Sequence, residues 1–192
     1  MPTRSARMAV VLGLLALVPG ACRSGGTRYH DANMDFGSIK TVAVLPLQNL
    51  SRDTQAGDRV RDVFVNTLLA TGSMYVLPQG EVIRGLMRVG VQNAVAPSAE
   101  EVQKLGAVLK CDAVIGGVVK EYGEVRSGGA GANVVSASLH MFEAATGKVV
   151  WSASSTKGGI TTTDRLFGGG GEPVNDVTEA LVNDLLDKLF SQ

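Results

Sequence analysis

A cysteine near the amino terminus carries the clearest chemical signal in this sequence. Cys22 follows two arginines and an apolar run of 11 residues from Met8 to Val18. This length is typical of an export signal, and it is shorter than the roughly 20 residues of a membrane-spanning helix. Ala21 supplies the small residue that precedes the cleavage point. We therefore expect residues 1–21 to be a lipoprotein signal peptide, with cleavage between Ala21 and Cys22 and lipid attached to Cys22.

The residues around the cleavage point allow one alternative to lipidation, and they indicate in which membrane a lipid anchor would lie. Pro19 stands where a lipobox usually has an aliphatic residue, so an ordinary export signal that leaves a free thiol at Cys22 is the alternative. In lipoproteins that resemble this one, Asp directly after the cysteine retains the protein in the inner membrane. Arg23 occupies that position here, which implies the outer membrane, with the domain in the periplasm.

The other reactive side chains do not assemble a catalytic or metal site. Neither His30 nor His140 has a cysteine, histidine or carboxylate at metal-ligand spacing. Glu121 and Glu124 belong to one predicted strand, where a spacing of three turns them to opposite faces and prevents acid–base cooperation. Cys111 opens a strand-like run and is interpreted as a small buried residue. We expect no enzyme activity, no cofactor and no metal.

Two glycine-rich stretches, 126–133 and 157–172, are candidate partner-binding loops. The second precedes a predicted helix but lacks the Gly-Lys-Ser/Thr ending of a phosphate-binding loop. The first lacks the dinucleotide-binding spacing and opens no helix. We interpret both as flexible loops that could contact a protein. The candidate residues are Gly128, Gly129, Gly131, Gly168, Gly169, Gly170 and Gly171.

Hydrophobic periodicity predicts the elements that position these residues. Strands are expected at 41–47, 74–77, 112–125, 135–141 and 148–156, and helices at 55–71, 81–89, 98–109 and 173–190. Ser98 and Glu101 form a capping box at the start of the third helix, and Thr146-Gly147 predicts a hairpin turn. This order predicts a single compact α/β domain, with a mixed sheet and flanking helices, behind the signal peptide.

Composition and segment lengths set the boundaries of that domain. Residues 23–34 are polar and without periodicity, so they read as a tether that spans at most about 40 Å. We expect a lipidated amino terminus and tether at 22–38 and the α/β domain at 39–192. Acidic and basic residues balance at 18 each, and aromatic residues make up 5%. With no basic stripe, a nucleic-acid partner is not expected.

Three tracts occur in a recognisable order. They are IKTVAVLPLQN at 39–49, LGAVLKCDAVIGGVVKEY at 105–122 and TGKVVWS at 146–152. Together they resemble the family that includes the curli-secretion lipoprotein CsgG and the penicillin-binding-protein activator LpoB. The resemblance covers roughly residues 39–160 and implies a sheet-and-helix domain. The amino-terminal domain of TolB is similar to the same arrangement, so the fold alone does not set the function.

The resemblance and the absence of catalytic groups predict a non-catalytic outer-membrane lipoprotein. It would assist envelope assembly or secretion by contacting an envelope protein through its sheet edge or its glycine-rich loops. One alternative is a subunit of an oligomeric CsgG-type secretion channel. Neither glycine-rich stretch, however, has the alternating pattern of roughly 9–11 residues that a membrane strand needs. Another alternative is an activator of a peptidoglycan synthase, although a tether at 23–34 is too short to cross the periplasm.

Overall fold

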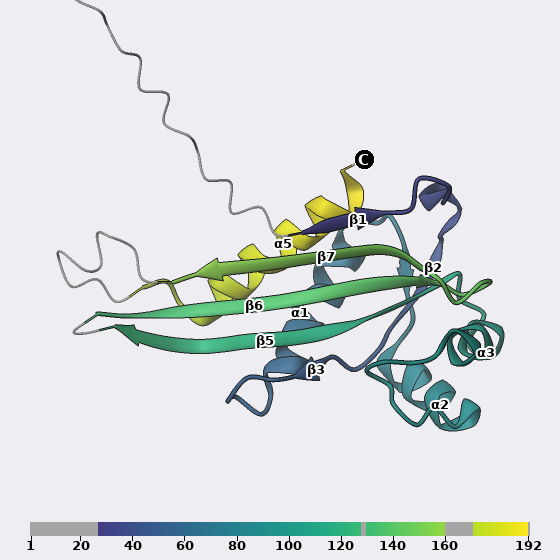
Figure 1. Ribbon diagram of the computed structural model, residues 1–192, viewed down its shortest axis with the longest axis horizontal. Helices are drawn as coiled ribbons and strands as arrows, with labels where there is room; N and C mark the ends of the chain where they lie inside the picture. Colours follow the sequence, from purple (N-terminus) through teal and green to yellow (C-terminus); the bar gives the residue numbers. More distant parts are fainter. Residues whose placement is uncertain (1–26, 128–129, 160–170, 192) are drawn as a thin grey trace, which may run out of the picture.

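A mixed β-sheet organises the whole domain. The computed structural model describes residues 27–127, 130–159 and 171–191. Within them, seven strands form one sheet in the order β1-β7-β6-β5-β2-β4, and β3 pairs with β5 (Figure 1). The strands are β1 (Arg28–His30), β2 (Thr41–Val44), β3 (Gln48–Asn49), β4 (Tyr75–Val76), β5 (Ala113–Ser127), β6 (Ala130–Glu143) and β7 (Val149–Gly158).

The three long strands and the short strand β2 differ in the direction of their pairing. β5, β6 and β7 pair antiparallel over most of their length. β2 runs parallel to both β4 and the first residues of β5. The long strands therefore extend beyond β2 and β4 as an arm, which Figure 1 shows toward the left.

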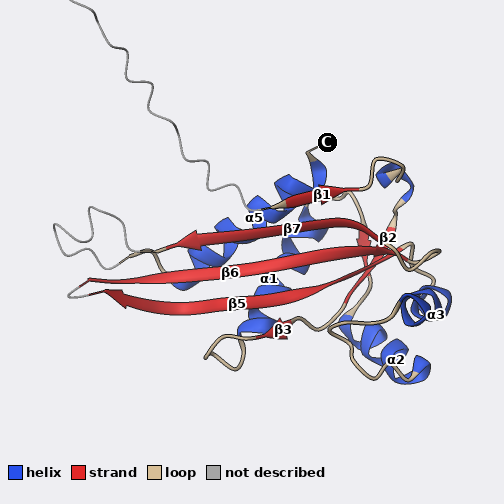
Figure 2. Cartoon of the chain, in the orientation of Figure 1, coloured by secondary structure: helices blue, strands red, loops and turns tan. Residues whose placement is uncertain are grey.

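Four α-helices in the described residues cover the two faces of the sheet (Figure 2). They are α1 (Ala56–Ala70), α2 (Gln79–Val89), α3 (Ala99–Leu109) and α5 (Val174–Phe190), and a short 3-10 helix, η1, spans Phe36–Ser38. α1 and α5 pack on one face, and α2 and α3 pack on the other face near β2. None of the helices in the described ranges has the length and apolar character needed to cross a bilayer.

Strand alternation separates two hydrophobic cores. Val42 and Val44 of β2 point into the larger core beneath α1 and α5, whereas Ala43 between them points into the smaller core beneath α2 and α3. Trp151 lies in the larger core with no exposed surface. Its indole Nε1 donates to the Lys188 carbonyl of α5 at 3.2 Å, so the sheet and this helix are joined by a specific hydrogen bond.

The predicted fold class is confirmed, because the structure is a single α/β domain with a mixed sheet and flanking helices. The capping box of α3 is present: Ser98 accepts from the Glu101 amide, and Glu101 accepts from the Ser98 amide. The predicted hairpin turn at Thr146-Gly147 joins β6 to β7. These features depend on residues that are close together in the sequence, which is why they could be predicted.

The prediction of a flexible loop at 126–133 is wrong for most of its length. β5 continues to Ser127 and β6 begins at Ala130, with Arg126 opposite Gly131 in the register. Glycine weakens a strand in isolation but does not forbid one. Here the antiparallel pairing between β5 and β6 keeps this glycine-containing stretch extended.

The prediction of an unstructured tether at 23–34 is wrong for Arg28–His30. These residues form β1 and pair antiparallel with β7, with Tyr29 opposite Ser152. Three residues are too few to show a periodic pattern, and their partner strand lies far away in the sequence. The sheet therefore begins before residue 39, and His30 belongs to a strand rather than to a tether.

Candidate functional site

Two of the predicted partner-binding glycines lie in the described residues, and each has a close neighbour. A Cβ atom on Gly131 would lie 2.4 Å from the Glu124 carboxylate on the neighbouring strand. Gly171 has a φ of 56°, and its Cβ would lie 2.9 Å from the Ala132 Cα. The other predicted site residues lie outside the described residues: Ala21, Cys22, Gly128, Gly129, Gly168, Gly169 and Gly170.

The structure brings the two glycine-rich stretches together at the end of the long arm. The Asn133 side-chain amide of β6 donates to the Glu172 carbonyl, just before α5, at 2.8 Å. The Gly159 amide donates to the Asn133 carbonyl at 2.9 Å. The predicted loops therefore meet at one place on the molecule, although no sequence pattern indicates that they are neighbours.

The outer half of β5 has an open edge. β3 pairs with Val118 and Val119, and the Leu50 amide then donates to the Val119 carbonyl at 2.9 Å. From Glu121 to Ser127, β5 pairs only with β6 among the residues that the structure describes. A strand edge of this kind presents a backbone donor and acceptor at every second residue, and these groups can pair with another chain.

A groove of about 800 Å³ runs beside this edge. It lies between the segment 50–53 and β5, and two exposed apolar side chains line it. Leu50 is 62% exposed and Val125 is 40% exposed. The Tyr122 side chain is buried, and its hydroxyl has no hydrogen-bond partner among the described residues. The groove therefore combines backbone hydrogen-bonding groups with apolar contact surface, which is the chemistry that an extended peptide needs.

The charges around the groove are mixed in sign. Arg52 and Lys120 line it together with Asp53 and Glu121. On β5, Arg126 donates to the Glu124 carboxylate at 2.9 Å, and this hydrogen bond raises the pKa of Arg126. A binding surface for a polyanion would carry one sign of charge, so this pattern fits a protein segment better than a nucleic acid.

The uncovered face of the long strands carries small polar side chains. His140 Nδ1 and Ser152 Oγ are 3.1 Å apart, and the hydroxyls of Ser136 and Thr156 are 2.8 Å apart. Partial burial, followed by the positive charge of Lys120, lowers the pKa of His140. These pairs lie on neighbouring strands, so His140 belongs to a polar strand face.

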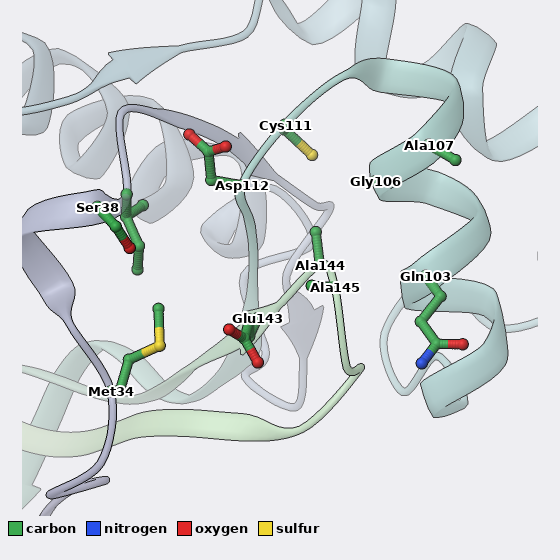
Figure 3. A pocket seen from close by; sticks show the side chains of 11 residues that line it. Met34, Ser38, Gln103, Gly106, Ala107, Cys111, Asp112, Glu143, Ala144 and Ala145 are labelled. Atoms are coloured by element: carbon green, nitrogen blue, oxygen red, sulfur yellow. The ribbon is translucent and has the colours of Figure 1, made fainter.

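Cys111 is one of the residues that line a second pocket, of about 630 Å³ (Figure 3). This pocket lies between α3, the turn before β5 and the turn between β6 and β7. Burial, and then the neighbouring Asp112 charge, raise the pKa of the Cys111 thiol to about 11. The Asp112 carboxylate accepts from the Lys40 and Thr41 amides at 2.9 and 2.8 Å. The thiol stays protonated at neutral pH and the carboxylate holds β2 in place, so the predicted buried role of Cys111 is confirmed.

The described residues contain no group of three or more His, Cys, Asp or Glu side chains that could hold a metal ion. Fold and site therefore define a single-domain α/β protein that offers an open strand edge. Residues 32–191 match the family described as "Putative lipoprotein GNA1162-like", and the chain belongs to that family. Among curated proteins, none matches this chain.

Several solved structures are similar to this chain. The PelC dodecamer from Paraburkholderia phytofirmans is 18% identical with a TM-score of 0.57, covering 85% of this chain and 96% of that chain. Lipoprotein GNA1162 from Neisseria meningitidis is 24% identical with a TM-score of 0.51, covering 77% and 99%. The LpoB C-terminal domain from Salmonella enterica is 10% identical with a TM-score of 0.49, covering 66% and 86%. The expected resemblance to the family of CsgG and LpoB stays a prediction.

The groove beside β5 was not predicted, although the lengths of the predicted strands contain a usable signal for it. The predicted strand at 112–125 is about twice as long as the predicted strand at 41–47 that could pair with it. A long strand beside a short one must leave part of its edge open unless another element covers it. Comparing strand lengths would therefore have pointed to this edge.

Proposed function

We propose that this protein is a non-catalytic envelope lipoprotein that acts through contacts with other proteins. In this proposal, Cys22 carries the lipid, the anchor lies in the outer membrane, and the domain is periplasmic. The family of lipoproteins to which the chain belongs supports the anchored role. Its function would lie in envelope assembly or secretion.

The observation that carries the proposal is the open edge of β5 with its groove. An extended segment of a partner would add to the sheet beside Glu121–Ser127 and continue the position that β3 occupies earlier along β5. Main-chain hydrogen bonds would supply affinity, and alternate apolar side chains of the partner would contact Leu50 and Val125. This is a recognition mechanism that requires no catalytic residue.

Site-specific photo-crosslinking in living cells tests this proposal. A photoreactive amino acid is placed at Leu50 or Val125, and at Met87 on α2 as the control, because Met87 is also exposed, at 68%. We expect positions 50 and 125 to form adducts with one envelope protein, identified by mass spectrometry, and position 87 not to form that adduct.

The identity of the crosslinked protein separates the remaining alternatives. A secretion or assembly component would support the leading role, and a peptidoglycan synthase would support the activator role. Equal yields of the same adduct at all three positions, or no adduct at positions 50 and 125, would contradict recognition through this edge. Intact-mass analysis of the native protein tests lipidation separately, since an unmodified thiol at Cys22 would exclude the anchor.

A second candidate function is a subunit of a homo-oligomeric assembly. The similarity of this fold to the PelC dodecamer supports it. In such a ring, a strand edge of one copy would lie against the next copy. Electron microscopy and light scattering of detergent-extracted protein test it: rings support the assembly, and a monomer at every accessible concentration contradicts it.

A further inference from the structure

The start of β1 limits how far the domain can lie from its proposed anchor. The Ser154 amide of β7 donates to the Thr27 carbonyl at 3.0 Å, so the chain is already held to the sheet at Thr27. Only residues 23–26 separate Cys22 from Thr27. From Cys22 to Thr27 the chain can span at most roughly 18 Å, less than half of what a tether at 23–34 would allow.

We propose that the β1 edge of the sheet and the carboxyl-terminal end of α5 lie against the phospholipid surface. This inference rests on the proposed lipidation of Cys22. Lipid attached there holds the amino-terminal residue at the membrane surface, and the short connection then brings the nearest part of the domain to the headgroups. The length of the connecting chain and the point where it ends select this surface over all others.

The chemistry of this surface suits a membrane interface. The Arg28 guanidinium donates to the Ser191 carbonyl and hydroxyl at 2.9 and 2.6 Å, which joins β1 to the end of α5. Next to these two residues, Tyr29 is 49% exposed and Phe190 is 41% exposed. Tyr is enriched at the boundary between lipid and water, and Phe is found on the apolar face of helices that lie in this boundary. Tyr29 and Phe190 are therefore each one residue from the Arg28–Ser191 contact that joins β1 to α5.

The sheet order separates α2 from the β1 edge. β1 and β4 are the two ends of the strand order, and α2 packs near β2, next to β4. β2 lies four strand spacings from β1, which corresponds to about 20 Å. Figure 1 likewise shows α2 on the side of the sheet opposite to β1. An exposed residue of α2 is therefore a suitable control for membrane contact.

Depth-dependent quenching of fluorescent probes tests this orientation on the full-length, lipidated protein. In a Cys111→Ala background, one cysteine is introduced by Tyr29→Cys, Phe190→Cys or Met87→Cys and labelled with a small fluorophore. The protein is reconstituted into phosphatidylethanolamine–phosphatidylglycerol vesicles that contain nitroxide-labelled lipid. We expect at least half of the fluorescence to be lost at positions 29 and 190, and little to be lost at position 87.

A matched variant isolates the role of the short connection. Insertion of twelve Gly/Ser residues after Ser24 keeps the lipid and the fold but removes the restraint on distance. We expect this insertion to reduce quenching at positions 29 and 190 severalfold, and circular dichroism verifies that the domain is folded. Unchanged quenching would mean that the aromatic surface binds lipid by itself, which still places this edge at the membrane.

The possible failures are distinguishable. One outcome is that mass spectrometry finds lipid on Cys22 and the protein floats with vesicles, but the probes at positions 29 and 190 are not quenched. In that case the proposed orientation is wrong, and the proposed lipid anchor is still supported. Quenching at position 87 alone would also overturn the orientation. If no lipid is found on Cys22, the proposed anchor fails, and the inference about the membrane-facing edge fails with it.

Discussion

The thiol of Cys111 shows how burial sets the chemistry of a single residue. This side chain is 6% exposed, and its pKa is raised from 9.0 to about 11. A protonated, enclosed thiol is a poor nucleophile, because the thiolate is the reactive form. The residue therefore contributes to packing beneath α3 and provides a measurable dependence of stability on pH.

The first prediction concerns that dependence. Because the pKa of Cys111 is raised by folding, the unfolded chain loses the thiol proton first as the pH rises. The contribution of this group to the free energy of unfolding is constant below pH 9 and falls between pH 9.0 and about 11, by up to roughly 3 kcal/mol. Denaturant unfolding over this range should show a steeper decrease for the native protein than for Cys111→Ala. Parallel decreases in the two proteins would refute the assignment.

The second prediction compares two glycines that have similar positive φ values and different surroundings. Gly147 and Gly72 have φ values of 71° and 65°. A Cβ on Gly147 would lie 2.4 Å from the Ala99 carbonyl oxygen, whereas a Cβ on Gly72 would meet nothing within 4 Å. We expect Gly147→Ala to lower the free energy of unfolding by about 3 kcal/mol and Gly72→Ala by about 1 kcal/mol. Equal losses in thermal or denaturant unfolding would show that the contact with α3 is unimportant.

At the scale of elements, α3 is fixed by its own first turn. Ser98 and Glu101 satisfy two amides at the helix start, and the backbone and side-chain hydrogen bonds with Ser98 lower the pKa of Glu101. Gly106 in the same helix lies so close to the β6–β7 turn that its Cβ would be 2.5 Å from the Ala144 Cβ. The cap therefore stabilises a helix that must approach the sheet closely.

The third prediction tests the cap. Ser98→Ala removes the side-chain acceptor for the Glu101 amide, and we expect it to lower the free energy of unfolding by about 1 kcal/mol. Ser73→Ala is the control, because Ser73 is also exposed and its side chain makes none of the hydrogen bonds found in the described residues. Equilibrium unfolding in urea measures both. If Ser73→Ala lowers the free energy of unfolding as much as Ser98→Ala does, the capping interpretation is contradicted.

At the scale of the whole molecule, the two cores share their strands. β2 sends Val42 and Val44 to one core and Ala43 to the other, and β5 does the same with Ala113 and Val114. A strand cannot leave one core without disrupting the other. The domain should therefore behave as one cooperative unit in spite of its two hydrophobic clusters.

The fourth prediction follows from this coupling. Trp151 is the only tryptophan and lies in the larger core, so its fluorescence reports unfolding of that core. Far-UV circular dichroism also reports α2 and α3, which cover the smaller core. We expect the two signals to give the same midpoint in denaturant. Separate midpoints would mean that the smaller core unfolds independently.

The proposed membrane contact and the proposed partner edge fit together on this molecule. β1 lies at one end of the strand order, and β7 and β6 separate it from β5. If β1 faces the bilayer, the open edge of β5 faces away from it. A partner in the periplasm could then reach the groove without competing with the membrane.

The amino-acid sequence by itself determined the features that depend on neighbouring residues. Helical periodicity gave α1, α2, α3 and α5 within a few residues of their observed bounds. The capping box at Ser98 and the turn at Gly147 require only local hydrogen bonds and a local backbone conformation. The signal peptide at residues 1–21 and the lipidation of Cys22 were likewise predicted from neighbouring residues alone. Both stay predictions because these residues lie outside the described part of the chain.

Only the tertiary structure decided which distant segments meet. Arg28–His30 form a strand because β7, more than a hundred residues later, offers its edge. The glycine-containing ends of β5 and β6 are extended because they pair with each other. Gly171 packs closely against Ala132, which is distant from it in the sequence. Short strands and glycine-rich strands have only a weak intrinsic preference for the extended conformation, so the strands that they pair with determine whether they form. For the same reason, the open edge of β5 and the short path to Cys22 became evident only once the sheet was assembled.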